Sequence, residues 1–177
     1  MRKLKLQELN RVSIEKFKET EKTPVVIVLD NVRSGLNVGS AFRTADAFAI
    51  EKIYLCGITA QPPHREILKT AIGATASMNW EHIDQTKEAI TQLQGEGYYI
   101  VAVEQAEGST LLQDFAIPFG SKIALVFGNE VNGVAQEIMG QINECIEVPQ
   151  FGTKHSLNIS VCMGVVIWEI FRKWKYA

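Results

Sequence analysis

Runs of apolar residues alternate along this chain with polar loops and with stretches of helical periodicity. Continuous apolar runs, rich in β-branched residues, predict buried strands at 25–29, 52–56, 98–103, 123–127 and 145–148. Apolar positions three or four residues apart predict helices at about 40–48, 66–71, 84–93 and 156–174. Strands that alternate with helices indicate an α/β fold with a mostly parallel sheet and helices on both faces.

The two ends of the chain depart from this alternation. Leu6, Leu9, Ser13 and Phe17 share one helical stripe, so residues 1–22 are predicted to form an amphipathic helical extension before a single domain over residues 23–177. The last predicted helix is apolar on nearly all sides, whereas a surface helix has a single apolar stripe. This pattern favours burial in the core on one side and contact with a second subunit on the other, although burial within one chain would also explain it.

Composition limits the possible functions without selecting one. The chain has 177 residues and a formal net charge of −2, which argues against a tight nonspecific nucleic-acid binder, although basic residues gather near both ends. We expect a cytoplasmic protein, because no signal peptide or membrane span is recognisable. The three cysteines are isolated, which favours structural thiols, and the three histidines lack metal-ligand spacing, so no metal site is expected.

Three segments share the order strand, Gly-containing polar loop and helix, at 30–45, 127–135 and 148–161. The first contains neither a dinucleotide-binding Gly-x-Gly-x-x-Gly nor a phosphate-binding Gly-Lys-Ser/Thr, so an oxidoreductase or a P-loop nucleotidase is disfavoured. Amide, hydroxyl and charged side chains remain. Singly, each has an ordinary structural explanation: Arg43 as a surface charge, Asn37 and Asn158 as turn or cap residues, Ser156 as a helix cap and Glu130 as a solvated carboxylate.

Taken together, the segments match a known pattern in order and spacing. They read Asn37-x-Gly39-Ser40-x-Phe42-Arg43-Thr44-Ala45, then Phe127-Gly128-x-Glu130-x-x-Gly133, then Val148-Pro149 leading to Ser156-Leu157-Asn158-Ile159-Ser160. This set resembles the three motifs of the SpoU/TrmH family, the SPOUT-class RNA 2′-O-ribose methyltransferases. The resemblance extends from about Pro24 to Trp168.

The resemblance implies an enzyme that transfers a methyl group from S-adenosylmethionine to a ribose 2′-hydroxyl of tRNA or rRNA, and that works as a homodimer. It also implies a deep C-terminal trefoil knot, built from the strand before Gly128, the strand that ends at Val148 and the loop after it. By motif match, the cofactor would contact Gly128, Val148 and Leu157, with Ser156 nearby. Gly128 is expected to let backbone approach the ligand closely, because it has no Cβ.

The motif match also implies roles for the candidate catalytic residues. Arg43 would stabilise the developing 2′-alkoxide, since a guanidinium is a poor base, and Asn37 would position Arg43 or the ribose. Glu130, Ser156 and Asn158 would order the motif loops. Two alternatives stay open: a catalytically silent RNA-binding or partner-binding relative of the same fold, and a flavodoxin-like nucleotide-binding protein, which the lack of a phosphate loop disfavours.

Overall fold

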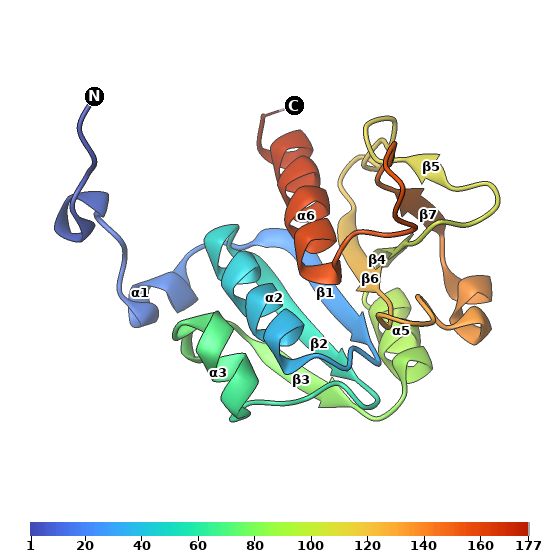
Figure 1. Ribbon diagram of the computed structural model, residues 1–177, viewed down its shortest axis with the longest axis horizontal. Helices are drawn as coiled ribbons and strands as arrows, with labels where there is room; N and C mark the ends of the chain where they lie inside the picture. The colour runs from blue at the N-terminus through green and yellow to red at the C-terminus, as the bar shows by residue number, and fades with distance from the viewer. Residues whose placement is uncertain (177) are drawn as a thin grey trace.

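In the computed structural model, which describes residues 1–176, a sheet is the centre of the molecule (Figure 1). Its strands are β1 (Thr23–Asp30), β2 (Ile50–Cys56), β3 (Trp80–Ile83), β4 (Tyr98–Val103), β5 (Thr110–Leu111), β6 (Lys122–Phe127) and β7 (Glu144–Glu147). The helices are η1 (Leu6–Leu9), α1 (Ile14–Glu19), α2 (Gly35–Ala47), α3 (Arg65–Ala71), α4 (Ala74–Ser77), α5 (Thr86–Gly95), η2 (Gln136–Gln141) and α6 (Ile159–Tyr176).

The strand order is β3-β2-β1-β6-β4-β7-β5, and every pairing is parallel. The chain moves outward from β1 through β2 to β3, then crosses to the other side of β1, where β6 later inserts between β1 and β4. Parallel sheets place ligand sites outside the carboxyl ends of the strands, where the winding direction changes. Here that point lies near β1, β6 and β4.

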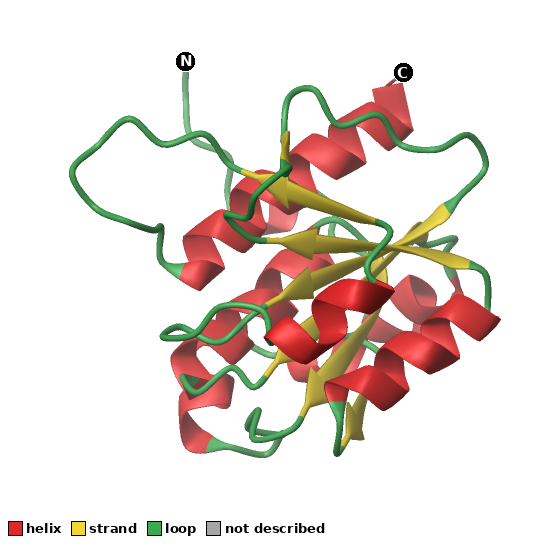
Figure 2. Cartoon of the chain, turned by 90° about the vertical axis from the view of Figure 1, so that its right-hand side faces the viewer, coloured by secondary structure: helices red, strands yellow, loops and turns green. Residues whose placement is uncertain are grey.

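Two apolar layers enclose the sheet because successive strand side chains point to opposite faces. On β1, Ile27 and Leu29 pack into the layer that also contains side chains of α2, α3 and α6, while Val26 and Val28 pack into the layer with α5 and η2. Figure 2 shows helices on both sides of the strands. The predicted mostly parallel α/β sheet, with helices on both faces, is confirmed.

Several predicted boundaries are wrong for identifiable physical reasons. Residues 35–39 are helical, not loop, because the Ser34 hydroxyl accepts a hydrogen bond from Asn37 N at 3.3 Å and starts α2 early. The last helix begins at Ile159 rather than Ser156. The helix expected from residue 84 begins at Thr86. The short strands β3 and β5 were not expected.

The predicted N-terminal amphipathic helix is also wrong as a single element. The structure has two short pieces, η1 and α1, joined by residues 10–13, which have no helix or strand, and α1 has no buried residue. Figure 1 shows this part of the chain running away from the sheet. Short isolated helices are marginally stable unless an apolar face is covered, and Phe17 of α1 is only partly buried against the core. The end of the proposed domain at residue 177 lies outside the described residues.

Candidate active site

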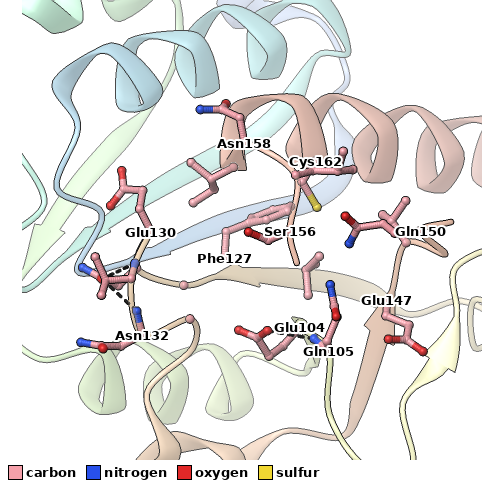
Figure 3. A pocket seen from close by; sticks show the side chains of 18 residues that line it. Glu104, Gln105, Phe127, Glu130, Asn132, Glu147, Gln150, Ser156, Asn158 and Cys162 are labelled. Atoms are coloured by element: carbon pink, nitrogen blue, oxygen red, sulfur yellow. Dashed lines mark hydrogen bonds between the residues drawn. The ribbon is translucent and has the colours of Figure 1, made fainter. Parts of the chain in front are cut away.

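A pocket with a volume of about 490 Å³ lies at the carboxyl ends of β4, β6 and β7 (Figure 3). Its walls come from three segments that follow these strands: 103–105, 127–133 and 147–162. The middle and last segments are two of the three predicted motif loops. The first motif does not line the pocket itself but borders it through Asn37, which is hydrogen-bonded to two lining residues.

Glu130 joins the first motif to the second. One carboxylate oxygen accepts hydrogen bonds from Ser34 N at 3.0 Å and Asn37 Nδ2 at 2.9 Å, and the other accepts one from Arg33 N at 2.9 Å. Burial alone would raise the pKa of Glu130, but these hydrogen bonds outweigh it, so the pKa lies below its ordinary value. A charged carboxylate is therefore favoured at the start of α2.

Asn158 joins the third motif to the first. Its Nδ2 donates to Asn37 Oδ1 at 3.3 Å, while its Oδ1 accepts hydrogen bonds from Ser160 N at 2.9 Å and Ser160 Oγ at 2.6 Å. Asn158 thus caps α6, which is one of the ordinary roles that its residue type suggested, whereas Ser156, the other candidate cap, lies before the start of the helix. The side-chain amide of Asn37 thus uses its Nδ2 toward Glu130 and its Oδ1 toward Asn158. The three residues form one connected network beside the pocket.

Behind this network, buried polar groups fix the segment after β1. Asp30 is 1% exposed and accepts hydrogen bonds from Asn31 Nδ2 at 2.8 Å, Thr86 Oγ1 at 2.5 Å and Ala135 N at 2.9 Å. Asn129 Nδ2 donates to Asn31 O at 2.7 Å, and Asn31 has a positive φ of 55°. These contacts hold the first and second motif segments in register, so the network in front of them has a rigid support.

Gly128 lies where two segments of the backbone pass close to each other. A Cβ at this position would overlap the backbone of Gly133 and Val134, and the same turn is closed by hydrogen bonds between Asn129 and Gly133. Gly128 was expected to let backbone approach a ligand. The close neighbour in the structure is the chain's own turn at Gly133. Gly128 is therefore needed for the backbone packing of the pocket wall.

A family model described as the SpoU rRNA Methylase family matches residues 24–168, which include all of β1 but its first residue, the three motif segments and most of α6. The chain belongs to the SpoU rRNA methylase family. The predicted resemblance to SpoU/TrmH proteins is thereby confirmed, and the match covers every residue of the network and of the pocket.

Individual relatives agree with this family assignment. The chain is 28% identical over 157 residues to a 23S rRNA (guanosine-2′-O-)-methyltransferase of Coxiella burnetii, covering 89% of this chain and 62% of the relative. It is 24% identical over 163 residues to a tRNA (guanosine(18)-2′-O)-methyltransferase of Borreliella burgdorferi, covering 92% and 73%. A crystal structure of an AdoMet-bound rRNA methyltransferase from Sinorhizobium meliloti superimposes with a TM-score of 0.79 at 27% identity, covering 91% and 61%. This chain thus spans less than two thirds of the Coxiella and Sinorhizobium relatives.

In this SpoU-family chain, the residues predicted to contact a cofactor all line the pocket. They are Gly128, Val148, Ser156 and Leu157. The backbone of residues 149–158 has no helix or strand, and Ser156 and Leu157 are exposed. The predicted catalytic residues Glu130, Ser156 and Asn158 also line the pocket, and Asn37 reaches it through Glu130 and Asn158.

Arg43 is the predicted residue that the structure leaves apart. It lies on the exposed side of α2, outside the pocket lining, and makes no side-chain hydrogen bond or ion pair with any residue from 1 to 176. The reason is helical geometry. Six residues beyond Asn37, Arg43 is more than one turn higher and on a different side of the helix. One chain alone therefore does not bring this guanidinium to the pocket.

Four polar residues of the pocket wall were not predicted from the sequence: Glu104, Gln105, Glu147 and Gln150. Glu104 and Gln105 directly follow β4, and Glu147 ends β7. A signal for them existed, because residues just past the carboxyl ends of parallel strands line the sites of α/β proteins. The segment after β4 belongs to none of the three motifs, so the family resemblance does not point to it.

The remaining predictions concern metals, cysteines and membranes. Within residues 1–176, no group of three or more His, Cys, Asp or Glu side chains is placed to hold a metal ion. Burial raises the pKa of Cys56 to about 12 and that of Cys162, in the pocket wall, to about 11, so these thiols are unreactive. No helix in the described part of the chain is long and apolar enough to cross a bilayer.

Proposed function

We propose that this chain is an S-adenosylmethionine-dependent RNA methyltransferase that modifies a ribose 2′-hydroxyl. The observation that carries the proposal is the hydrogen-bonded network of Glu130, Asn37 and Asn158 beside a pocket of the SpoU fold. The three motif segments lie far apart in sequence, and each contributes one member. The names of the Coxiella and Borreliella relatives, both guanosine 2′-O-methyltransferases, support the same reaction.

The pocket fits S-adenosylmethionine in size and charge. Its volume of about 490 Å³ lies within the roughly 300–1,000 Å³ of small-molecule sites. Gly128, Val148 and Leu157 would hold the cofactor, with Ser156 beside them, and the Sinorhizobium relative was crystallised with AdoMet bound. When bound, the cofactor supplies a methyl group on a positively charged sulfur, which is a good leaving group.

The chain's own residues then have to position and activate the ribose. Asn37 is held by Glu130 and Asn158, so its position at the pocket edge is fixed before RNA arrives, as preorganised catalysis requires. Arg43 would stabilise the negative charge that develops on the 2′-oxygen and bind an adjacent phosphate. Because Arg43 has no partner among the described residues, its charge is available for that role.

A second copy of the chain would explain how Arg43 reaches a pocket. On α2, Leu36, Ser40, Arg43 and Ala47 follow one helical stripe on the outer side. The neighbouring helix α6 exposes apolar side chains, with Val161 at 53%, Val165 at 41% and Trp168 at 48%. We propose that the homodimer forms across this face, so that Arg43 of one copy lies near the pocket of the other. Exposed apolar patches of this kind are typical of subunit contacts.

We also propose that the C-terminal part of the chain forms a trefoil knot. The C-terminal segment contacts the stretch between β4 and β6 at two places. Gln105 Nε2 donates to His155 O at 2.9 Å, and Lys173 Nζ donates to the carbonyl oxygens of Leu112, Gln113 and Phe115 at 2.7–3.0 Å. These contacts support a path in which residues after β7 pass through the loop formed by residues 104–121. Knotted chains are rare exceptions among folds.

We further propose that residues 1–22 form an extension outside a catalytic domain that starts at residue 23. We also propose that the protein is cytoplasmic and that its substrate is a tRNA or an rRNA. The extension carries basic residues that suit a phosphate backbone, among them Arg2, Lys3, Lys5 and Arg11. The named relatives divide between tRNA and 23S rRNA.

The decisive experiment maps 2′-O-methylated riboses by mass spectrometry in RNA from cells with and without this chain. Loss of one methylated position, restored by the purified chain with S-adenosylmethionine, is expected. An unchanged methylation pattern, with no transfer to tRNA or rRNA in vitro, would favour the catalytically silent RNA-binding or partner-binding relative.

A further inference from the structure

The charged side chains of the pocket wall are all acidic. Three glutamates line it, Glu104, Glu130 and Glu147, and none of its lining residues is a lysine, arginine or histidine. S-adenosylmethionine carries a sulfonium and an ammonium against one carboxylate, which gives a net charge of +1. The product of methyl transfer, S-adenosylhomocysteine, has a neutral thioether in place of the sulfonium. The two ligands therefore differ by one positive charge inside an acidic pocket.

The three glutamates are not equivalent. Glu130 is already used, because it accepts three hydrogen bonds from the first motif. Glu147 has no side-chain hydrogen bond to any residue that the structure describes, and in Figure 3 it lies on the side of the pocket away from Glu130. Glu104 lies between them in that view. The network of Glu130, Asn37 and Asn158 is where the ribose is proposed to react, so the sulfur has to lie toward that side.

Glu104 is held firmly in its position. Its Oε2 accepts a hydrogen bond from Val134 N at 3.0 Å, and its Oε1 accepts one from Gln105 N at 2.8 Å. A Cβ added to Gly133 would overlap Oε2, so the carboxylate lies directly against the Gly128–Gly133 turn. A charge fixed by two backbone donors beside the pocket loses no side-chain freedom when a ligand binds.

We propose that Glu104 distinguishes the charged cofactor from its neutral product. Resting on the proposed function, this inference assigns to Glu104 the counter-charge for the sulfonium, which favours binding of the substrate form and release of the product form. Coulomb attraction at a partly solvated site is sufficient: at an effective dielectric of about 20–40, one charge at about 6 Å is worth a tenfold change in affinity or more. Glu104 acts here as a specificity residue and takes no part in bond breaking.

Titration calorimetry with S-adenosylmethionine and S-adenosylhomocysteine, in the absence of RNA, tests this directly. The measured quantity is the ratio of the two dissociation constants. In Glu104→Gln, the preference for S-adenosylmethionine should fall about tenfold relative to wild type, equal to about 1.4 kcal/mol. Sinefungin carries an amine cation in place of the sulfonium. Its affinity should therefore fall in Glu104→Gln by about as much as that of S-adenosylmethionine.

Two further variants separate charge from structure. Glu104→Asp keeps the charge and should keep most of the preference, even where both affinities fall. Glu147→Gln removes the same charge on the far side of the pocket and should change the ratio less than about threefold, because attraction falls with distance.

A Glu104→Gln variant that weakens both ligands equally, or neither, overturns the assignment to Glu104 while leaving the proposed function intact. A ratio that falls equally in Glu147→Gln also overturns it, because the effect would then belong to the whole pocket. A wild-type chain that binds neither ligand overturns the proposed function and this inference together.

Discussion

Asn37 Nδ2 donates a hydrogen bond to Glu130 Oε1 over 2.9 Å, although the two residues are 93 positions apart in sequence. The same carboxylate accepts the backbone N–H groups of Arg33 and Ser34, so it holds the start of α2 against the segment after β6. Asn158 completes the arrangement from the start of α6. The contact is therefore both a structural joint and the edge of the proposed reaction site.

Glu130→Gln tests this joint. The amide places an NH₂ group opposite backbone donors, so at least one of the three hydrogen bonds is lost. We expect a loss of about 1 kcal/mol in the free energy of unfolding, at the lower end of the usual range because Glu130 is exposed. Denaturant unfolding measures it. The exposed Glu107→Gln is the matched control and should stay within about 0.5 kcal/mol of wild type; equal effects would contradict the proposed role of Glu130.

Arg43→Ala tests the catalytic assignment. The side chain is exposed and has no partner among residues 1–176, so the melting temperature should not change. The specificity constant kcat/KM for methyl transfer should fall about 10²- to 10³-fold if Arg43 stabilises the developing alkoxide. Arg65→Ala removes another exposed arginine, on the neighbouring helix α3, and should change the rate less than about threefold. Wild-type turnover in Arg43→Ala would rule out the assignment.

Val165→Asp tests the proposed dimer face. A carboxylate in the middle of the exposed apolar stripe of α6 has to be desolvated when a second copy binds, which costs several kcal/mol. Analytical ultracentrifugation should show a dimer for wild type and a monomer for the variant. Phe119→Asp changes an apolar side chain that is fully exposed in a loop and should remain dimeric. A wild-type chain that sediments as a monomer would refute the face altogether.

Replacing each of two helical glycines, Gly39 and Gly164, by alanine should change the stability of the chain in opposite directions. A Cβ at Gly39 would overlap Thr70 Oγ1 and Ile67 O, because α2 and α3 pack closely at this point, whereas nothing lies within 4 Å of a Cβ at Gly164. Gly39→Ala should destabilise the chain by about 1–3 kcal/mol through overpacking. Gly164→Ala should stabilise the chain by up to about 1 kcal/mol through helix propensity when it is measured in the Val165→Asp background, where no second copy covers this face of α6. Thermal unfolding measures the change in melting temperature for both variants. Changes of the same sign would show that the packing of α2 against α3 does not determine the effect at Gly39.

Acid stability should depend on Glu169. Hydrogen bonds from Arg172, and to a smaller extent from Lys173, lower the pKa of Glu169 from an ordinary 4.5 to about 2. A carboxylate with a lowered folded-state pKa contributes stability above its unfolded pKa and loses it as the pH falls through the folded value. The wild type should thus be more stable than Glu169→Gln above pH 4.5, and the difference should disappear as the pH falls to about 2. A difference that persists unchanged at the lowest pH would contradict this linkage.

The sequence predicted the main strands because a strand buried on both faces needs a continuous apolar run, as in Val25–Leu29. It failed where local signals compete. Gly35 and Gly39 suggested a loop, but Ser34 caps a helix there, and Gly39 is required by contact with α3. The N-terminal stripe suggested a helix, but helical periodicity does not form a stable helix without a surface to cover it.

The sequence by itself determined the family, the parallel α/β architecture and the identities of the motif residues, because these depend on residue types and their order along the chain. Tertiary structure decided which of them meet. It brought Asn37, Glu130 and Asn158 into one network, left Arg43 on an outer face, and placed Glu104 against the Gly133 turn. The physical reason is that contacts between residues about a hundred positions apart depend on how strands are ordered in the sheet, which no local pattern encodes.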